Sequence, residues 1–351
     1  MSEVVTQNQY KWIEQAALLS DGKMVRNEFA RIDDSEAINK WRCRFNNTDI
    51  FYSICIYSSP ANSVDFLCPK FFDIDCAENL PVTRESALIL CEMIMSKIGV
   101  PPNCIEIYFS GNKGFHVIVP TVVFGAFSTP YALLLNRKMA EKAEEAGARF
   151  IDKGIYTSRR LFRYPNSKNS KSGLYKIPLP YEELRDMDIN GILKLAENPR
   201  PEDSYAFPVM CKSAVSWNHD AIERVQKGIS NHHSSDKNTS TKFKKGWRRP
   251  PCVKNIQEAI FPDGIRHHAY LSLARFYSWI NMHPDEIFEL IQIIDNKNPI
   301  RDPGSIERAI RSACEHPGFA GCDDEVFKKY CCKDICFYAK LKGQNRSSLN
   351  E

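Results

Sequence analysis

Two aspartates, Asp73 and Asp75, end an apolar segment with the sequence FFDID. Side chains two apart on a strand point to the same face, so we expect both carboxylates on one rigid surface. Such oxygen ligands bind Mg²⁺ or Mn²⁺ when substrate phosphates complete the metal shell. Two solvated acids at a strand end are the alternative, because an Asp-x-Asp pair is common.

A glycine loop follows the next apolar run, and its sequence is SGNKGFH. Glycines let backbone N–H groups turn toward an anion, and a lysine and a histidine add further donors. The loop lacks the spacing of a Walker loop, and a plain hairpin is the alternative. We interpret it as a contact for a triphosphate, with these candidate residues: Ser110, Gly111, Lys113, Gly114 and His116.

An isolated Asp152 precedes the segment RLFRYPNSKNSKSGLYKIPL (160–179), which contains basic residues and no acid. We interpret Asp152 as the third carboxylate of the metal site, carried by a neighbouring strand within 148–152. Arginines present planar forks to phosphate, and lysines attract a nucleic-acid backbone. A solvated basic hairpin is the alternative. The nucleotide-binding candidates here are Arg160, Arg163, Ser167 and Lys171, with Lys168 and Lys176 as further basic positions.

The elements that must position these residues mix strands and helices as far as about residue 215. This mixture predicts an α+β fold. Periodicity and turn residues predict a mostly helical 1–40, strands at 50–57 and 66–75, a strand–loop–strand unit at 104–120, and helices at 85–99 and 131–147.

The chain is long enough, at 351 residues, for two domains. Between residues 226 and 249 apolar residues nearly vanish, and seven Lys or Arg stand against one Asp. Such a composition predicts a flexible basic linker, after which helical periodicity resumes. The predicted organisation is a catalytic domain at 1–225, a linker at 226–249 and an all-α domain at 250–342.

Membrane and secreted classes are disfavoured. No apolar run approaches the ~18 residues of a membrane span. The N-terminal sequence MSEVVTQNQYKW lacks the pattern of a signal peptide. We therefore expect a cytoplasmic protein that has no membrane partner.

A group of cysteines lies late in the chain. Cys252 opens the predicted helical domain, and Cys322, Cys331, Cys332 and Cys336 lie near its end. In a reducing compartment such a cluster favours a metal centre over disulfides. Four thiolates can hold either zinc or an iron–sulfur cluster, and the spacing does not separate Cys331 from Cys332. Unliganded core cysteines are the alternative.

The ordered motifs DxD, SGxKGxH and an Asp followed by R-L-x-R-x-P-x-S…K-S-G…P-L resemble the catalytic subunit of archaeo-eukaryotic primases over about residues 25–180. The resemblance implies a primase-type core in which Asp73, Asp75 and Asp152 bind two Mg²⁺ or Mn²⁺ ions. It also implies that the loop residues Ser110, Lys113 and His116 contact nucleotide phosphates, beside the two arginines Arg160 and Arg163.

Two departures from the family pattern are visible. Asn169 stands where the family often has a histidine, which puts one nucleotide contact in doubt. Residues 117–151 contain no cysteine, so the zinc knuckle that many members insert there is missing. The catalytic core is therefore expected to be compact.

The opening Pro-Pro-Cys, the helical filling and the closing GC…YCCKDIC resemble the iron–sulfur domain of the primase large subunit. This second resemblance implies a [4Fe–4S] cluster, with Zn²⁺ as the alternative. The implied ligands are Cys252, Cys322, Cys331 and Cys336, and Cys332 is the alternative to Cys331.

Together the resemblances imply a DNA primase or primase-polymerase, which makes primers on single-stranded DNA from nucleoside triphosphates. A replicative helicase or polymerase is a plausible partner, and a nucleoid, plasmid or viral replication site is the expected location. One alternative is a gap-filling repair polymerase, which shares the catalytic motifs. Another is a non-catalytic nucleic-acid-binding protein with a metal or redox centre.

Overall fold

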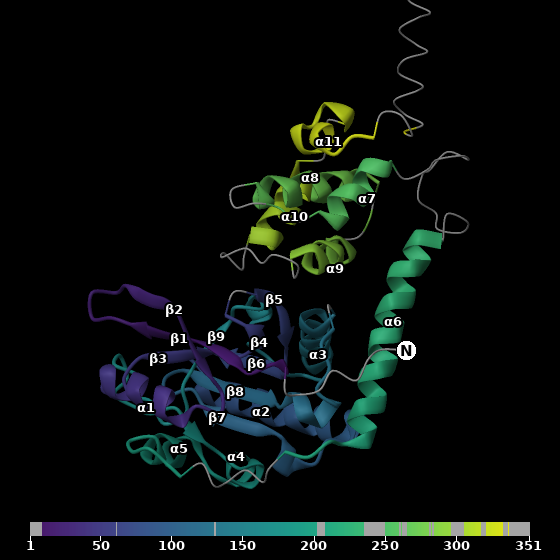
Figure 1. Cartoon of the computed structure of the whole chain (residues 1–351). Coiled ribbons are helices and arrows are strands. Elements are labelled where there is room, and N and C mark those ends of the chain that lie inside the picture. Colours follow the sequence, from purple (N-terminus) through teal and green to yellow (C-terminus); the bar gives the residue numbers. More distant parts are fainter. Residues whose placement is uncertain are drawn as a thin grey trace, which may run out of the picture. The chain divides into compact units, whose positions relative to one another are not determined.

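The computed structural model describes residues 9–60, 62–129, 131–201, 208–234, 250–259, 261, 265–280, 282, 284–295, 305–316, 321–332 and 336. Helices and strands are mixed within them, as an α+β fold requires (Figure 1). By its internal contacts the chain divides into two compact units, Met1–Lys227 and Gly228–Glu351. Each unit is described by itself.

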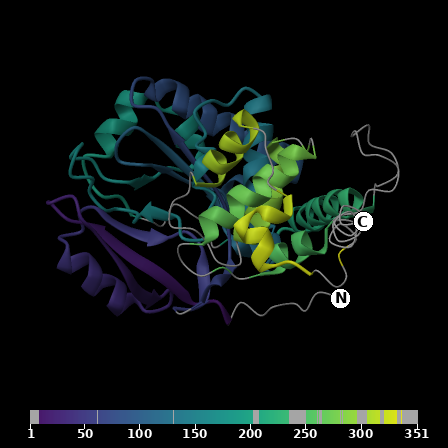
Figure 2. The same cartoon turned by 90° about the horizontal axis from the view of Figure 1, so that it is seen from above.

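The first unit contains two β-sheets. In Figure 2 the purple N-terminal strands lie on one side of this unit, apart from the blue and teal elements around the second sheet. The larger sheet has the order β5 (Asn62–Leu67), β4 (Ile56–Ser59), β1 (Trp12–Leu18), β3 (Ile50–Ser53), β9 (Leu161–Arg163), with β2 (Met24–Arg31) paired to β1. The smaller sheet has the order β10 (Ile177–Pro178), β7 (Glu106–Phe109), β8 (Gly114–Val119), β6 (Lys70–Asp75).

Helices cover the smaller sheet. Helix α2 (Leu80–Met93) packs on β6 and β8, and α3 (Ala132–Glu145) packs on β6. The Asn79 side chain caps α2 by accepting a hydrogen bond from the Val82 amide. The helix continues as a π-helical turn, and Gly99 then ends it in the left-handed conformation. The helices predicted at 85–99 and 131–147 are thus confirmed.

The prediction of a mostly helical 1–40 is wrong for the described residues. Strands β1 and β2 form an antiparallel pair there, and a helix, α1 (Ser35–Arg44), begins only after them. The sequence WIEQAAL contains good helix formers, but β1 lies inside the sheet, with β2 on one side and β3 and β4 on the other. Tertiary strand pairing therefore overrides local helix propensity.

The alternative of a basic hairpin at 160–179 holds only for the middle of this segment, where Lys168 and Tyr175 form an antiparallel bridge. The first strand of the segment, β9, pairs with β3 in the larger sheet, whereas its last, β10, pairs with β7 in the smaller sheet. The segment therefore connects the two sheets. Three helices follow it: α4 (Tyr181–Asp186), α5 (Ile189–Leu195) and α6 (Lys212–Ser234).

Helix α6 runs through the first part of the segment that composition predicts as a linker. The rest of that segment, 235–249, lies outside the described residues, as do residues 337–342 of the predicted helical domain. No helix among the described residues combines the length and the apolar character needed to span a membrane.

The described part of the second unit contains helices and turns but no strand. Helix α10 packs on α8 and α9 around a core that includes Leu273, Phe276 and Ile291. The helices are α7 (Pro251–Glu258), α8 (Arg266–Trp279), α9 (Pro284–Asp295), α10 (Ser305–Glu315) and α11 (Glu325–Lys329).

Candidate active site

The two predicted aspartates of β6 lie beside the glycine loop. Strand β6 pairs antiparallel with β8, which sets Asp73 opposite His116 and Asp75 opposite Gly114. Asp73 is buried, with 6% of its surface exposed, and Asp75 is half-buried. The DxD motif and the loop are therefore neighbours, as their order in the sequence predicts.

Asp152 joins this pair from the other edge of β6. Ile151 forms an antiparallel bridge with Ile74, and the Asp152 amide donates to the Asp73 carbonyl at 2.9 Å. The contact is a single bridge and not the strand predicted within 148–152. The exposed Asp152 carboxylate accepts a hydrogen bond from the Gly154 amide at 2.9 Å. Three carboxylates thus come together from two chain segments.

Among the described residues, two basic side chains pair with the three acids. Arg160 donates to Asp73 Oδ2 at 3.0 Å and lies 4.0 Å from Asp152 Oδ2. The Lys113 ammonium lies 3.0 Å from Asp75 Oδ2. Three carboxylates beside two such cations leave an excess of negative charge, which favours a bound metal ion.

The excess of negative charge is most evident at Asp73. Burial, and next the charge of Asp75, raise its pKa to about 7, although Arg160 offsets part of the effect. Among the described residues its Oδ1 accepts no hydrogen bond, and His116 Nε2 lies 3.5 Å away. A buried carboxylate oxygen without a donor suits a cation, so these residues fit Mg²⁺ or Mn²⁺.

No group of three or more His, Cys, Asp or Glu in the described part of the chain is already arranged to hold a metal ion. At the acid site, Arg160 and Lys113 each bond to a carboxylate oxygen that a cation would take. Metal binding would therefore require these two side chains to give up their present partners.

His116 is held neutral in a crowded, positively charged environment. Burial, and next the charges of Lys176, Arg160 and Arg163, keep its pKa well below the usual range. Its ring stacks on Phe162 with 4.2 Å between centroids, which joins the smaller sheet to β9 of the larger one. The imidazole is thus a hydrogen-bonding group and not a cation at neutral pH.

Several buried polar atoms around the acids make no hydrogen bond within the described residues. They are Ser110 Oγ, His116 Nδ1 and Arg160 Nε. Buried polar groups are normally paired, so unpaired ones clustered at one place indicate a ligand site. All three residues are among the predicted nucleotide contacts.

The loop glycines have a packing reason as well. A Cβ on Gly114 would lie 1.8 Å from the Ile74 carbonyl oxygen, so only glycine lets the loop lie against β6. Gly111 has a φ of +83°, and a Cβ there would lie 3.0 Å from the Lys176 amide nitrogen. These glycines fix the loop against the strands that carry the acids.

Most of the predicted nucleotide contacts in the basic segment do not bond to the three acids. Arg163 is paired with Asp49 at 2.7 Å, and the Ser167 hydroxyl donates to the Tyr164 carbonyl at 2.8 Å. The side chain of Lys171 is exposed. Lys176 is fully buried and donates to the Arg163 carbonyl at 2.9 Å. Arg160 alone among these side chains bonds to the acids.

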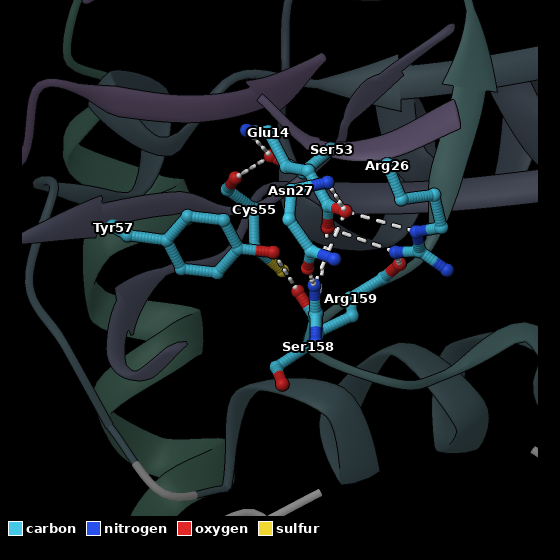
Figure 3. Close-up of polar contacts among 8 residues, drawn as sticks. All are labelled: Glu14, Arg26, Asn27, Ser53, Cys55, Tyr57, Ser158 and Arg159. Atoms are coloured by element: carbon cyan, nitrogen blue, oxygen red, sulfur yellow. Dashed lines mark hydrogen bonds and ion pairs between the residues drawn. The ribbon is translucent and has the colours of Figure 1, made fainter. Parts of the chain in front are cut away.

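A second carboxylate–arginine cluster was missed by sequence reasoning (Figure 3). Glu14 is fully buried in β1 and accepts from Arg26 at 2.8 and 2.9 Å, from the Asn27 amide at 3.0 Å and from Arg159 at 3.1 Å. Arg159 also donates to Asn27 Oδ1 at 2.7 Å. An acid inside the apolar run WIEQAAL was the available signal, which the helix prediction concealed.

This cluster fixes the chain next to the acids. The Tyr57 hydroxyl donates to the Ser158 carbonyl at 2.7 Å, and Arg26 donates to the Arg159 carbonyl at 3.1 Å. Arg160 follows directly and turns to Asp73. The Glu14 cluster therefore holds in place the backbone from which Arg160 reaches the candidate site.

In the second unit the predicted cysteine ligands are near one another. Burial, and then the charges of Cys336, Cys331 and Cys322, raise the pKa of Cys252 to about 11. Cys332 is not among these neighbours, and its sulfur accepts a hydrogen bond from Asn255 at 2.7 Å. Four sulfur atoms within electrostatic reach have the chemistry of a thiolate-bound metal or cluster. The described cysteines do not form a group of three or more arranged around an ion, and the choice between Cys331 and Cys332 stays a prediction.

No family model matches this chain, and none of the curated proteins compared with it matches either.

Proposed function

We propose that this protein is a DNA primase or primase-polymerase, which transfers nucleotides to a growing primer on a single-stranded DNA template. The observation that supports it most is Asp73, a buried carboxylate with a pKa near 7. It lies with two further acids beside buried polar atoms that lack partners. Carboxylates that can hold a cation, beside donors that can bind phosphate oxygens, suit a metal-dependent reaction on a phosphate ester.

Asp73, Asp75 and Asp152 would hold the divalent cations. When bound, Mg²⁺ or Mn²⁺ ions activate the attacking 3′-hydroxyl and stabilise the leaving pyrophosphate. Arg160 and Lys113, which now pair with Asp73 and Asp75, would turn to phosphate oxygens as the nucleotide enters.

The glycine loop would orient the triphosphate. Ser110 Oγ and the neutral His116 ring would donate hydrogen bonds to its oxygens, which satisfies two groups that have no partner now. Because burial, and next the charges of Lys176 and the nearby arginines, lower the pKa of His116 and keep it neutral, the imidazole would position the phosphate without adding a charge. Orientation and preorganised donors supply much of the catalysis in phosphoryl transfer.

The helical unit would hold a [4Fe–4S] cluster, or Zn²⁺, on Cys252, Cys322, Cys331 and Cys336. Joined to the catalytic unit in one chain, it would act at high effective concentration, which favours holding two nucleotides at initiation. The template strand and a replicative helicase or polymerase are the proposed partners.

Primer synthesis on single-stranded DNA with labelled nucleotides and Mg²⁺ or Mn²⁺ tests the proposal. We expect short products from the wild type without added primer. Asp75→Asn should lower the rate by about 100- to 1000-fold, since a metal contributes several kcal/mol and each 1.4 kcal/mol is tenfold. Asp33→Asn is the matched control, because Asp33 is an exposed acid paired with Arg31.

The other outcomes are distinct. Extension only of a supplied primer would replace primase with a gap-filling repair polymerase. Binding of single-stranded DNA without any metal-dependent product would leave a non-catalytic binding protein.

A further inference from the structure

An exposed phenylalanine lies directly against the candidate site. Phe150 has 44% of its surface exposed, and its carbonyl accepts a hydrogen bond from the Asp75 amide at 3.0 Å. Asp152 follows two residues later. The ring is therefore carried by the backbone that joins two of the three acids.

The backbone of Phe150 is strained. Its φ is +61°, in the left-handed region that bulky residues avoid. Of the seven non-glycine residues with positive φ in the described part of the chain, five are Asn or Asp, which tolerate this region. The sixth is the buried Ala126. Phe150 alone among them combines a large apolar ring with solvent exposure.

The surrounding contacts hold Phe150 in this conformation. On one side the Arg149 amide donates to Ser86 Oγ at 2.8 Å. On the other, Ile151 bridges to Ile74, and the Asp152 amide is bonded to Asp73. Strain that neighbours fix at a site is characteristic of functional positions. An Asn here would suit the backbone better, and an exposed ring gains little from burial.

We propose that Phe150 is a stacking platform for a nucleobase, and so a binding residue for the substrate of the acid site. This inference rests on the proposed function, in which the acids and hydrogen-bond donors of the site bind the metal ions and the phosphates. Phe150 would bind the base of the same substrate. Aromatic rings stack with any base and so bind nucleotides without selecting a sequence. Arg149, which precedes Phe150 in the chain and is exposed, adds a positive charge suited to the same ligand.

The base belongs either to a bound nucleoside triphosphate or to a DNA strand, and two pairs of probes separate these sources. The first pair is a deoxynucleoside triphosphate and inorganic tripolyphosphate, measured by calorimetry at one Mg²⁺ concentration. The second is a deoxythymidine oligonucleotide and an abasic strand of equal length, measured by fluorescence anisotropy. Within each pair, only the first member offers a base.

Phe150→Asn removes the ring and keeps the left-handed backbone, and Phe150→Tyr keeps the ring. We expect Phe150→Asn to weaken binding of one base-bearing probe by about 5- to 100-fold, the usual effect of losing one stacked base. Its affinity for the matching base-free probe should stay within about twofold. Phe150→Tyr should bind as the wild type does. Thermal unfolding should show that Phe150→Asn is no less stable than the wild type, because Asn relieves the strain.

Equal losses on the base-bearing and base-free probes would overturn stacking while leaving the phosphate site intact. So would unchanged binding of all four probes by Phe150→Asn. If the wild type binds neither tripolyphosphate nor any strand, the proposed function is overturned, and the stacking inference with it.

Discussion

Two neighbouring arginines of one loop reach two buried carboxylates, and the two pairs differ in kind. Arg159 bonds to Glu14, which also accepts from Arg26 and from a backbone amide. Arg160 bonds to Asp73, whose second oxygen accepts no hydrogen bond from the described residues. The first carboxylate is fully paired, whereas the second is left with capacity for another cation.

The pKa values follow this difference. Burial alone would raise the pKa of Glu14, but hydrogen bonds and charge from Arg26, with Asn27 and Arg159, hold it below its ordinary value. Burial and the neighbouring Asp75 raise the pKa of Asp73 to about 7. A paired buried charge is costly to break, whereas an uncompensated one lowers stability and is kept where a ligand can supply the compensation.

Matched amide substitutions provide the largest test of this comparison. Glu14→Gln should lower the free energy of unfolding by about 3–5 kcal/mol, because it leaves two arginines without their buried partner. Asp73→Asn should leave it unchanged or raise it at pH 8, since it removes a charge that the fold accommodates poorly. Urea unfolding of the full chain measures both. Equal destabilisation would mean that Asp73 is also an ordinary structural acid.

The pH dependence of Mg²⁺ binding is the second test. Below pH 7 a proton on Asp73 competes with the cation, so the affinity should fall up to about tenfold per pH unit and level off above pH 7. Without Mg²⁺, the stability of the fold should depend on pH in the opposite direction. Stability should fall as the pH rises from the ordinary Asp range toward 7, because the folded state holds the proton more tightly. Calorimetric titration with Mg²⁺ across this range measures the affinity.

Two controls sharpen the titration. Asp73→Asn should bind Mg²⁺ weakly and without the break near pH 7, whereas Asp33→Asn should behave as the wild type. A wild-type affinity that does not change with pH would remove Asp73 from the metal site.

The sequence predicts the members of this site better than it predicts their partners. Two-residue spacing places Asp73 and Asp75 on one strand, and glycines reveal the loop beside them. Asp152 is close to the pair as predicted, since its amide bonds to Asp73. The aspartate pair and the loop depend on local patterns, which a sequence records directly, whereas the prediction for Asp152 depended on the order of the motifs along the chain.

Long-range pairing is what the sequence does not record. Arg163 resembles a phosphate contact by type and position, yet its partner is Asp49, which is 114 residues away in the chain. Glu14 lies in a segment rich in helix formers, and only the pairing of β1 with its neighbours makes it a strand. Local propensity cannot decide such cases, because burial and pairing outweigh it.

The adjacent arginines themselves give the smallest and most direct test. Arg160→Gln should move the pH midpoint of Mg²⁺ binding upward by up to about one unit, because Arg160 lowers the pKa of Asp73. Arg159→Gln should leave this midpoint in place and lower the free energy of unfolding by about 1–3 kcal/mol, since Glu14 loses one charged donor. The two arginines lie in the same loop, they undergo the same substitution, and their side chains are both partly exposed. If both move the midpoint equally, the loop responds as a unit, and the division between a structural and a functional pair is wrong.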